Sequence, residues 1–489
     1  MSRSLVRAVV RANALRSLAA TGTLLASSAL PAQGFVRDHP PALGEPARLA
    51  VPAVHETRLA NAIDVSVVEQ RELPLVQVIA SFAGGARLDG ATPGLASFTA
   101  NMLDEGAGDR DATSLQSELA YLGASLQVAS EWDRIYVALK VPVRSLAPAL
   151  DLMADVIRRP TFSAGEVRRQ RDLRLASLLQ QRDQPNALAE LAFYFIVYPA
   201  GHPYHNSAGG DSASTASLDS AAVRHFYDRA IRPGNARFVV VGDLTEGEAR
   251  QAIAQRFGNW RVAGTTATVP AVTVAPLRQG QTHVYLVDKP NAAQSVIDIG
   301  WPGVDRVSPD YAPLMVMNSL LGGAFTSRLN MNLREEHGYS YGAGSRFDMR
   351  LAAGPFFAAA GVQTDKTVES LTEFFKEVDG MRAPVPDDEL SRGKNLEALS
   401  FPGTFETTGD MAGQLADLVV YGLPDTFFDE YVPKIQAVTA ADLQRTADRF
   451  LHSDAFVVVV AGDLAKIEQP IRAANFGVVT VITADDLLK

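Results

Sequence analysis

The chain has 489 residues, of which 47% are hydrophobic and 20% charged, with a formal net charge of −10 and no cysteine. That length accommodates two or more domains with cores of their own. An acidic chain without a long basic run argues against nucleic-acid binding through phosphate contacts. The lack of cysteine excludes disulfides, thiolate metal sites and cysteine nucleophiles.

The N-terminal residues have the pattern of a targeting segment. Four arginines among the first 16 residues precede a short apolar run at 18–30. A basic start, a compact apolar run and a small residue near the expected cut predict a signal peptide over residues 1–32, followed by a flexible lead-in at 33–50. We therefore expect a periplasmic or secreted protein with no integral membrane segment after cleavage. Because no acidic residue precedes Asp38, a mitochondrial transit peptide is the alternative.

The first half after this leader alternates strand and helix patterns. A helix with apolar positions at Leu95, Phe98 and Met102 begins just after Gly94. Ser163 followed by Glu166 predicts a capping box at the start of a long helix. In chain order the predicted elements are strands at 63–68 and 76–83, helices beginning at 95 and 113, strands at 124–130 and 134–141, and helices at 145–157 and 163–181.

An internal repeat is the strongest architectural signal. LDSAAVRHFYDRAIRPGNARFVVVGDL (218–244) aligns without a gap with VTAADLQRTADRFLHSDAFVVVVAGDL (438–464), at an offset of 220 residues. In each copy a plausible N-cap, Asp219 or Thr439, opens an amphipathic helix. An apolar run ending in Gly-Asp-Leu follows and predicts a central strand.

The second half repeats the order of the first. Adjacent strands joined by short turns imply a largely antiparallel sheet with packed helices. We expect an α+β fold with two homologous domains, 51–263 and 281–489, joined by a linker at 264–280. The predicted elements are strands at 283–288 and 296–300, helices at 310–321 and 327–336, strands at 340–347 and 356–362, and helices from 367 onward.

Five stretches together carry a family resemblance: SFAGGARLDGATPGLASFTANML, QQRDQPNALA, GHPYH, RPGNARFVVVGDL and LNMNLREEHGYSYGAGS. With them the chain resembles the pitrilysin/insulinase-type zinc peptidases, particularly their bacterial and mitochondrial-processing branch. The match spans nearly the whole mature chain. The resemblance implies two α/β sandwich domains that form one half of a clam-shell.

The zinc motif of that family is degenerate in this sequence. Family members carry His-x-x-Glu-His on the helix that begins here at Leu95. This chain has Ser97 and Asn101 at the two histidine positions and Ala100 at the glutamate position, and the third ligand falls at Ser177. Hydroxyl and amide oxygens are poor substitutes for imidazole and carboxylate. We therefore expect no metal and no cofactor in this chain.

The remaining histidines offer no replacement site. His202 and His205 are the closest pair, in a Pro-containing loop without an acidic partner at helical spacing, and His225 and His337 stand alone. The glycines at 322 and 323 match neither the dinucleotide fingerprint nor the P-loop. They predict a close backbone approach before the helix at Ser327, where Ser327 and Arg328 could help line a substrate cavity.

Two residues of the second half survive from the family's catalytic set. Arg334 and Tyr341 lie seven residues apart in LREEHGYSYGAGS. The resemblance implies that the arginine holds substrate carbonyls and that the tyrosine donates to the oxyanion. Spacing alone would instead pair Arg334 with Glu335 or Glu336 and pack Tyr341 in a strand. The strands at 76–83 and 340–347 are candidate edges for peptide pairing, and the alternative is that they lie in the interior of their sheets.

These observations support three functional hypotheses. The first is a subunit that is inactive alone and supplies Arg334 and Tyr341 in trans to a homologous zinc-bearing subunit, in a heterodimer that cleaves short or unfolded peptides. The second is a non-catalytic structural or peptide-binding homologue. The third, a peptidase with relocated chemistry, lacks a supporting Ser-His-Asp arrangement.

Overall fold

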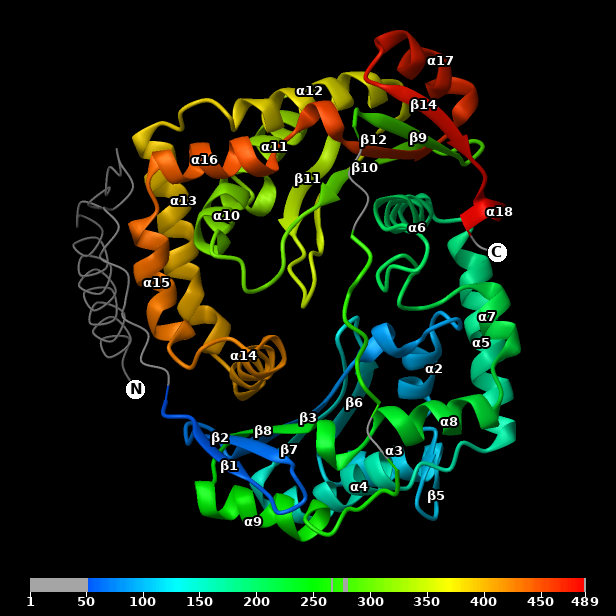
Figure 1. Ribbon diagram of the computed structural model, residues 1–489, viewed down its shortest axis with the longest axis vertical. Helices are drawn as coiled ribbons and strands as arrows, with labels where there is room; N and C mark the ends of the chain where they lie inside the picture. Colours follow the sequence, from blue (N-terminus) through cyan, green and yellow to red (C-terminus); the bar gives the residue numbers. More distant parts are fainter. Residues whose placement is uncertain (1–51, 265–266, 276–279, 488–489) are drawn as a thin grey trace, which may run out of the picture. The chain divides into compact units, whose positions relative to one another are not determined.

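The computed structural model describes residues 52–264, 267–275 and 280–487 (Figure 1). The predicted signal peptide at 1–32 and the predicted lead-in at 33–50 lie outside these residues. Within them the chain forms two six-stranded sheets and a two-residue-strand hairpin, β4 (Gly106–Ala107) with β5 (Arg110–Asp111). No helix in the described part of the chain is long and apolar enough to cross a membrane.

The first sheet has the order β1-β2-β8-β3-β7-β6. All its neighbouring strands are antiparallel except β2 and β8. Its strands are β1 (His55–Arg58), β2 (Asp64–Glu69), β3 (Leu75–Ala83), β6 (Ser125–Ser130), β7 (Arg134–Pro142) and β8 (Ala236–Gly242).

In the second sheet, β11-β12-β10-β13-β9-β14, the first five strands repeat the order β6-β7-β3-β8-β2 of the first sheet, and β14, near the end of the described chain, takes the edge that β1 takes there. β9 pairs in parallel with both β13 and β14, and the other neighbours are antiparallel. The predicted repeat of two largely antiparallel sheets is thus confirmed. The strands are β9 (His283–Asp288), β10 (Gln294–Pro302), β11 (Ser340–Phe347), β12 (Pro355–Gln363), β13 (Val457–Gly462) and β14 (Val478–Ile482).

The helices follow the same repeat. In the first half they are α2 (Leu95–Asn101), α3 (Ala112–Tyr121), α4 (Leu146–Arg158), α5 (Ala164–Gln181), α6 (Pro185–Val197), α7 (Ser212–Ser217), α8 (Ser220–Ala230) and α9 (Glu246–Phe257). In the second half they are α10 (Tyr311–Asn318), α11 (Arg328–Asn330), α12 (Thr367–Gly380), α13 (Asp387–Ser400), α14 (Thr408–Tyr421), α15 (Phe427–Ala437), α16 (Ala440–Phe450), α17 (Leu464–Ala474) and α18 (Ala484–Leu487). Two predicted helices continue as π-helical turns, at Ser319–Gly323 and Met331–Glu336.

Side-chain caps set the starts of the repeated helices. Asp219 and Thr439 each accept a hydrogen bond from the backbone N–H three residues on, as their shared position in the repeat predicts. Ser163 also caps its helix in this way. The predicted capping box is only half formed, because the Glu166 carboxylate binds Arg169 instead of the N-cap backbone.

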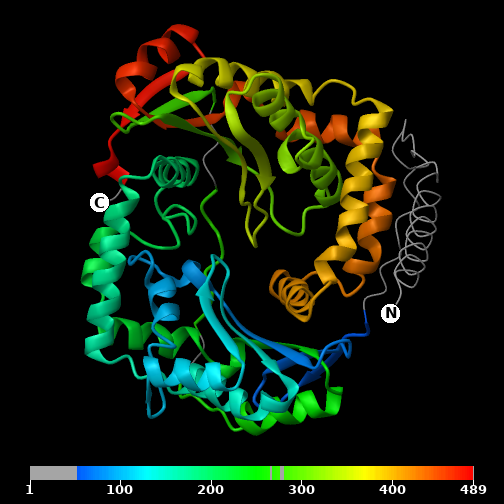
Figure 2. The same ribbon diagram turned by 180° about the vertical axis from the view of Figure 1, so that it is seen from behind.

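Each half lends one helix to the sheet of the other half (Figures 1 and 2). α6, from the first half, packs on β10 and β13 of the second sheet, whereas α14, from the second half, packs on β3 and β8 of the first. Phe193 of α6 is fully buried and lies edge-to-face with Phe357 of β12. The two halves therefore share cores, which the sequence did not predict.

A buried polar network joins the turns of two equivalent hairpins. Arg350, from the β11–β12 connection, stacks on Trp132 of the β6–β7 turn at 4.4 Å and donates to the Tyr194 hydroxyl at 2.8 Å. The neighbouring Asp133 carboxylate accepts from the Leu351 backbone N–H and the Tyr204 hydroxyl, both at 3.1 Å. The network fixes the two hairpins to each other.

The linker predicted at 264–280 runs without helix or strand wherever the structure describes it. It is held to the first half, since the Ala267 N–H donates to the Arg229 carbonyl at 3.1 Å. The domain limits 51–263 and 281–489 stay predictions of the sequence.

Candidate functional site: the degenerate motif and the Arg–Tyr pair

The helix that carries the degenerate motif, α2, is fixed by its N-terminal turn. Gly94 has φ of 82°, and a Cβ there would lie 2.6 Å from the Gly209 carbonyl oxygen, so only glycine fits without strain. The Asp89 carboxylate accepts hydrogen bonds from the backbone N–H groups of Gly94 and Ala96, at 2.8 and 2.7 Å. These bonds satisfy donors that the first turn of a helix leaves free.

The two faces of α2 have different surroundings. The apolar face is buried in the first-half core, and Ala100, at the glutamate position of the motif, is fully buried there. Ser97 is half-buried and Asn101 is exposed, so both lie on the face that would hold a metal. The predicted packing helix is confirmed, and the positions of the lost ligands remain accessible to a side chain from α5.

That side chain is Arg174. Its Nη1 donates to the Ser97 hydroxyl at 2.9 Å and to the Gly94 carbonyl at 3.1 Å. The hydrogen-bonding surroundings orient the Asn101 amide so that its oxygen accepts from Arg174 Nη2 at 3.1 Å. One guanidinium therefore contacts both positions where the family has histidines.

Burial changes the acid–base properties of this cluster. Desolvation lowers the pKa of Arg174 to about 10, and the neighbouring Asp89 carboxylate opposes that shift. Desolvation raises the pKa of Asp89 to about 7, against the effect of its two backbone hydrogen bonds and of Arg174. Among the described residues no acid lies within ion-pair distance of the guanidinium, whose hydrogen-bond acceptors are neutral oxygens.

The donors present do not fit a zinc ion. Ser177, the predicted third position, is exposed and makes no hydrogen bond to α2 in the described part of the chain. A hydroxyl, an amide and a cationic guanidinium offer none of the anionic or imidazole ligands that zinc requires. Across residues 52–264, 267–275 and 280–487, no group of three or more His, Asp or Glu side chains is arranged to hold a metal.

Arg334 and Tyr341 lie on two elements that contact each other, a π-helical turn and the strand β11. Arg334 belongs to the π-helical turn Met331–Glu336, where its Nε lies 3.2 Å from a Glu335 carboxylate oxygen and its guanidinium lies over the Phe325 ring at 4.9 Å. π-helical turns are frequent at functional sites. The ion pair with Glu335 leaves the arginine side chain 42% exposed, so its other donors remain free to bind a ligand.

Tyr341 is placed outside the strand ladder by a bulge. The register between β11 and β12 shifts between Ser340 and Ala343, and the Ser340 hydroxyl accepts from the Gly342 N–H at 3.0 Å. Tyr341 is 90% exposed, and its hydroxyl has no partner among the described residues. Tyr341 lies in β11, as the alternative interpretation expects, but its side chain is exposed and does not pack in the core.

Only one of the two predicted edge strands is an edge. Among the residues that the structure describes, β11 is the terminal strand of the second sheet and pairs on one side only, with β12. β3, predicted as a candidate at 76–83, lies inside the first sheet between β7 and β8. Its hydrophobic run fits a strand buried on both faces, and a pattern of that kind does not distinguish an edge from an interior strand.

The other polar residues singled out in the sequence have structural partners. His202 Nδ1 accepts from the Tyr204 N–H at 3.0 Å, and burial lowers the pKa of His202 to about 4. His205 binds the Tyr198 carbonyl. Arg328 makes a bidentate ion pair with Glu389, with distances of 2.7 and 2.8 Å, which occupies the guanidinium.

The remaining features of this region are also structural. His225 is exposed on α8, and His337 stacks on Tyr339 at 4.9 Å. A Cβ at Gly322 would lie 2.4 Å from the Ser345 nitrogen, which confirms the expected close approach. Ser327 is buried.

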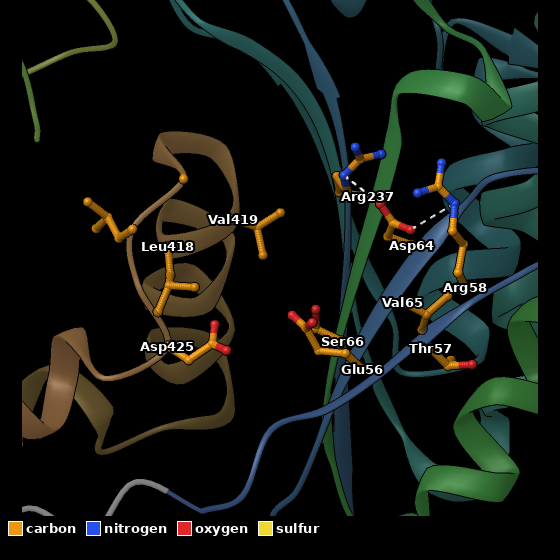
Figure 3. Close-up of a pocket in the computed structure, with 12 residues that line it drawn as sticks. Glu56, Thr57, Arg58, Asp64, Val65, Ser66, Arg237, Leu418, Val419 and Asp425 are labelled. Carbon is orange, nitrogen blue, oxygen red and sulfur yellow. Dashed lines mark ion pairs between the residues drawn. The ribbon is translucent and has the colours of Figure 1, made fainter.

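A cavity of about 410 Å³ lies between the first sheet and α14 (Figure 3). Its charged wall is formed by β1, β2 and β8, where Asp64 pairs with both Arg58 (3.5 Å) and Arg237 (3.0 Å). Its apolar wall is formed by Leu418 and Val419 of α14. None of the predicted site residues lines it, and both of its arginines are engaged by Asp64.

Comparison with known proteins places the chain in a family. Residues 68–198 match the model of insulinase (peptidase family M16), and residues 217–397 match the model of the peptidase M16 inactive domain. An uncharacterized zinc protease from Mycobacterium bovis is 26% identical over 347 residues, which are 70% of this chain and 74% of the relative. The non-peptidase homolog YmxG from Helicobacter pylori is 23% identical over 392 residues, 78% of this chain and 88% of the relative.

A solved structure agrees with these matches. The peptidase M16 inactive domain from Pseudomonas fluorescens superposes with a TM-score of 0.78 at 28% identity, over 84% of this chain and 98% of that one. The two models together cover well over half of the chain, and the expected resemblance is confirmed. The chain belongs to the pitrilysin/insulinase-type M16 peptidase family, among its inactive-type members.

Proposed function

We propose that this chain is the non-zinc-binding subunit of a heterodimeric M16 peptidase, supplying Arg334 and Tyr341 to the zinc site of a homologous partner. The observation that carries the proposal is Tyr341, whose hydroxyl projects without a partner in the described residues from a bulged edge strand. An exposed tyrosine in this position contributes nothing to the core. A hydroxyl that is free to donate is what a developing oxyanion requires.

The chemistry divides between the two subunits. Zinc held by the partner would polarise the scissile carbonyl and activate water. In this chain the guanidinium of Arg334 presents several fixed donors to backbone carbonyls of the substrate. The hydroxyl of Tyr341 donates to the oxygen that becomes negative during attack.

The position of β11 at the edge of its sheet favours peptides as the substrates. An extended peptide can add to the free side of β11 by backbone hydrogen bonds, in the same strand that carries Tyr341. Only a segment without its own secondary structure can pair in this way, so the substrates are short or unfolded peptides. The targeting pattern at residues 1–32 favours assembly in the periplasm or outside the cell, with the mitochondrion as the alternative.

A second candidate is a non-catalytic structural or peptide-binding homologue. The ion pair between Arg334 and Glu335 favours it, because a paired arginine has less to offer a substrate. The printed name of the Helicobacter pylori relative, non-peptidase homolog, points the same way for that protein. The free hydroxyl of Tyr341 favours the first candidate.

Reconstitution of the heterodimer distinguishes the two candidate functions. The mature chain is expressed alone and together with a His-x-x-Glu-His homologue from the same genome, and each sample is assayed for zinc and for cleavage of a quenched fluorescent peptide. Activity only in the mixed sample supports the trans role. Absence of association and of activity supports the structural homologue, and zinc-dependent activity of the chain alone overturns both.

A further inference from the structure

We propose that Arg174 is a resident cation that occupies the place of the lost metal, and that it closes this site to divalent ions. The proposal rests on the family assignment of the degenerate positions that also underlies the proposed function. This proposal adds to the loss of the zinc ligands. It names a side chain that would still weaken metal binding if the ligand residues were restored.

The first argument is the contact set of the guanidinium. Ser97 and Asn101, the positions of two family ligands, both accept hydrogen bonds from Arg174, at 2.9 and 3.1 Å. A guanidinium within hydrogen-bond distance of both positions leaves no room between them for an ion, whose ligands sit about 2 Å away.

The second argument is charge. The guanidinium of Arg174 is cationic at neutral pH, as arginine side chains are in proteins. No acid among the described residues lies within ion-pair distance to compensate it. A divalent cation placed beside a guanidinium that has no ion-pair partner, in a partly buried site, is repelled more strongly than it would be in water.

The third argument is that the guanidinium performs the metal's structural task. It joins α5 to the side chains of α2, to the Gly94 carbonyl and, at 3.4 Å, to the Gly209 carbonyl. Its plane also lies over the Phe98 ring at 5.1 Å. Three segments are thus held at one point, as a ligated ion would hold them, and the fold keeps its arrangement without zinc.

The position of Arg174 on α5 explains how its guanidinium reaches the place where the family holds zinc. Arg174 lies three residues before Ser177, so both are on one face of α5. The longer arginine side chain reaches α2 from one turn earlier.

The test measures zinc, without a partner and without peptidase activity. Three substitutions, Ser97→His, Asn101→His and Ser177→Glu, return the ligand types, and this ligand-restored chain is compared with and without Arg174→Leu. Zinc content is determined by mass spectrometry after dialysis, and affinity by competition with a chromophoric chelator. We expect one zinc per chain with Arg174→Leu, and affinity at least ~100-fold weaker when Arg174 is kept.

Two further variants test whether the positive charge of Arg174 is what excludes zinc. Arg171→Leu, on the same helix, removes an arginine that does not contact α2 and should leave the ligand-restored chain without zinc. Arg174→Lys keeps the charge and loses the planar fork, and it too should exclude zinc. Equal zinc affinity with and without Arg174 would overturn the proposal, and so would absence of binding in both chains, because the guanidinium would then not be what closes the site.

A pair of variants with fewer substitutions keeps the proposal testable if the triple variant folds poorly. Ser97→His with Asn101→His places two imidazoles one turn apart, a spacing that binds divalent ions weakly, and adding Arg174→Leu should strengthen Ni²⁺ binding ~10-fold or more. An unchanged affinity would overturn the proposal. Failure of the reconstituted heterodimer would leave these measurements untouched, so the two proposals fail separately.

Discussion

The exchange of helices between the halves predicts that the described part of the chain unfolds as one unit. Phe193 lies in α6 of the first half, yet it is fully buried against the second sheet, with its ring centroid 5.1 Å from that of Phe357. Phe193→Ala removes a buried aromatic side chain, which costs about 3–5 kcal/mol, including ~1 kcal/mol for the edge-to-face pair. A loss of ~4 kcal/mol lowers the folding equilibrium constant roughly 10³-fold.

Urea denaturation followed by both fluorescence and far-UV circular dichroism measures this effect. Phe257→Ala is the matched control, because Phe257 is equally buried but packs only among residues of the first half. Both variants should shift one common transition, seen with both probes. Two separate transitions, of which Phe257→Ala shifted one and Phe193→Ala the other, would refute the reasoning.

The remaining predictions concern the site and the junction. Tyr341→Phe should lower kcat of the reconstituted heterodimer ~10²-fold with assembly unchanged, whereas Tyr121→Phe, at an equally exposed tyrosine, should leave the rate of peptide cleavage as it was. Arg334→Ala should raise KM in the same assay, and Arg472→Ala, with similar exposure and a similar ion pair, should not. Arg350→Leu removes the buried cation between the hairpins and should lower the free energy of unfolding by about 3 kcal/mol, measured by urea titration; a change below ~1 kcal/mol would mean that the network contributes little. Asp89 has a pKa of about 7 in the folded chain and about 4 when unfolded, so its contribution to stability is full below pH 4 and is lost as pH rises through 7. Asp89→Asn should therefore flatten the fall in unfolding free energy between pH 4 and 7, and an unchanged slope would contradict the assigned shift.

Local sequence signals predicted the repeated elements well. The strands at 283–288 and 340–347 were placed with the bounds that the structure has. The N-caps at Asp219 and Thr439 were placed correctly because a cap depends on neighbours three residues away. The sequence left open whether the strand at 76–83 lies at an edge or in the interior, since the order of strands in a sheet depends on pairing between distant segments.

The sequence contains no signal that predicts the exchange of α6 and α14 between the two halves. The apolar face of α6 would look the same whether it packed on its own half's sheet or on the other, because hydrophobic periodicity reports burial and not the partner. Arg174 was also missed. Helix α5 carries Arg168, Arg169, Arg171 and Arg174 within seven residues, and only the relative placement of α2 shows which of them reaches the degenerate motif.

The exchanged helices also determine the order in which the polypeptide can complete its cores during synthesis. The β3–β8 face of the first sheet waits for α14, some 170 residues after β8, before it is covered. Until the ribosome has made that segment, a broad apolar surface of the nascent chain faces water or a chaperone. Contacts of such long sequence separation close slowly. A chain truncated at the linker would therefore keep its strands but would expose the very surface that drives aggregation.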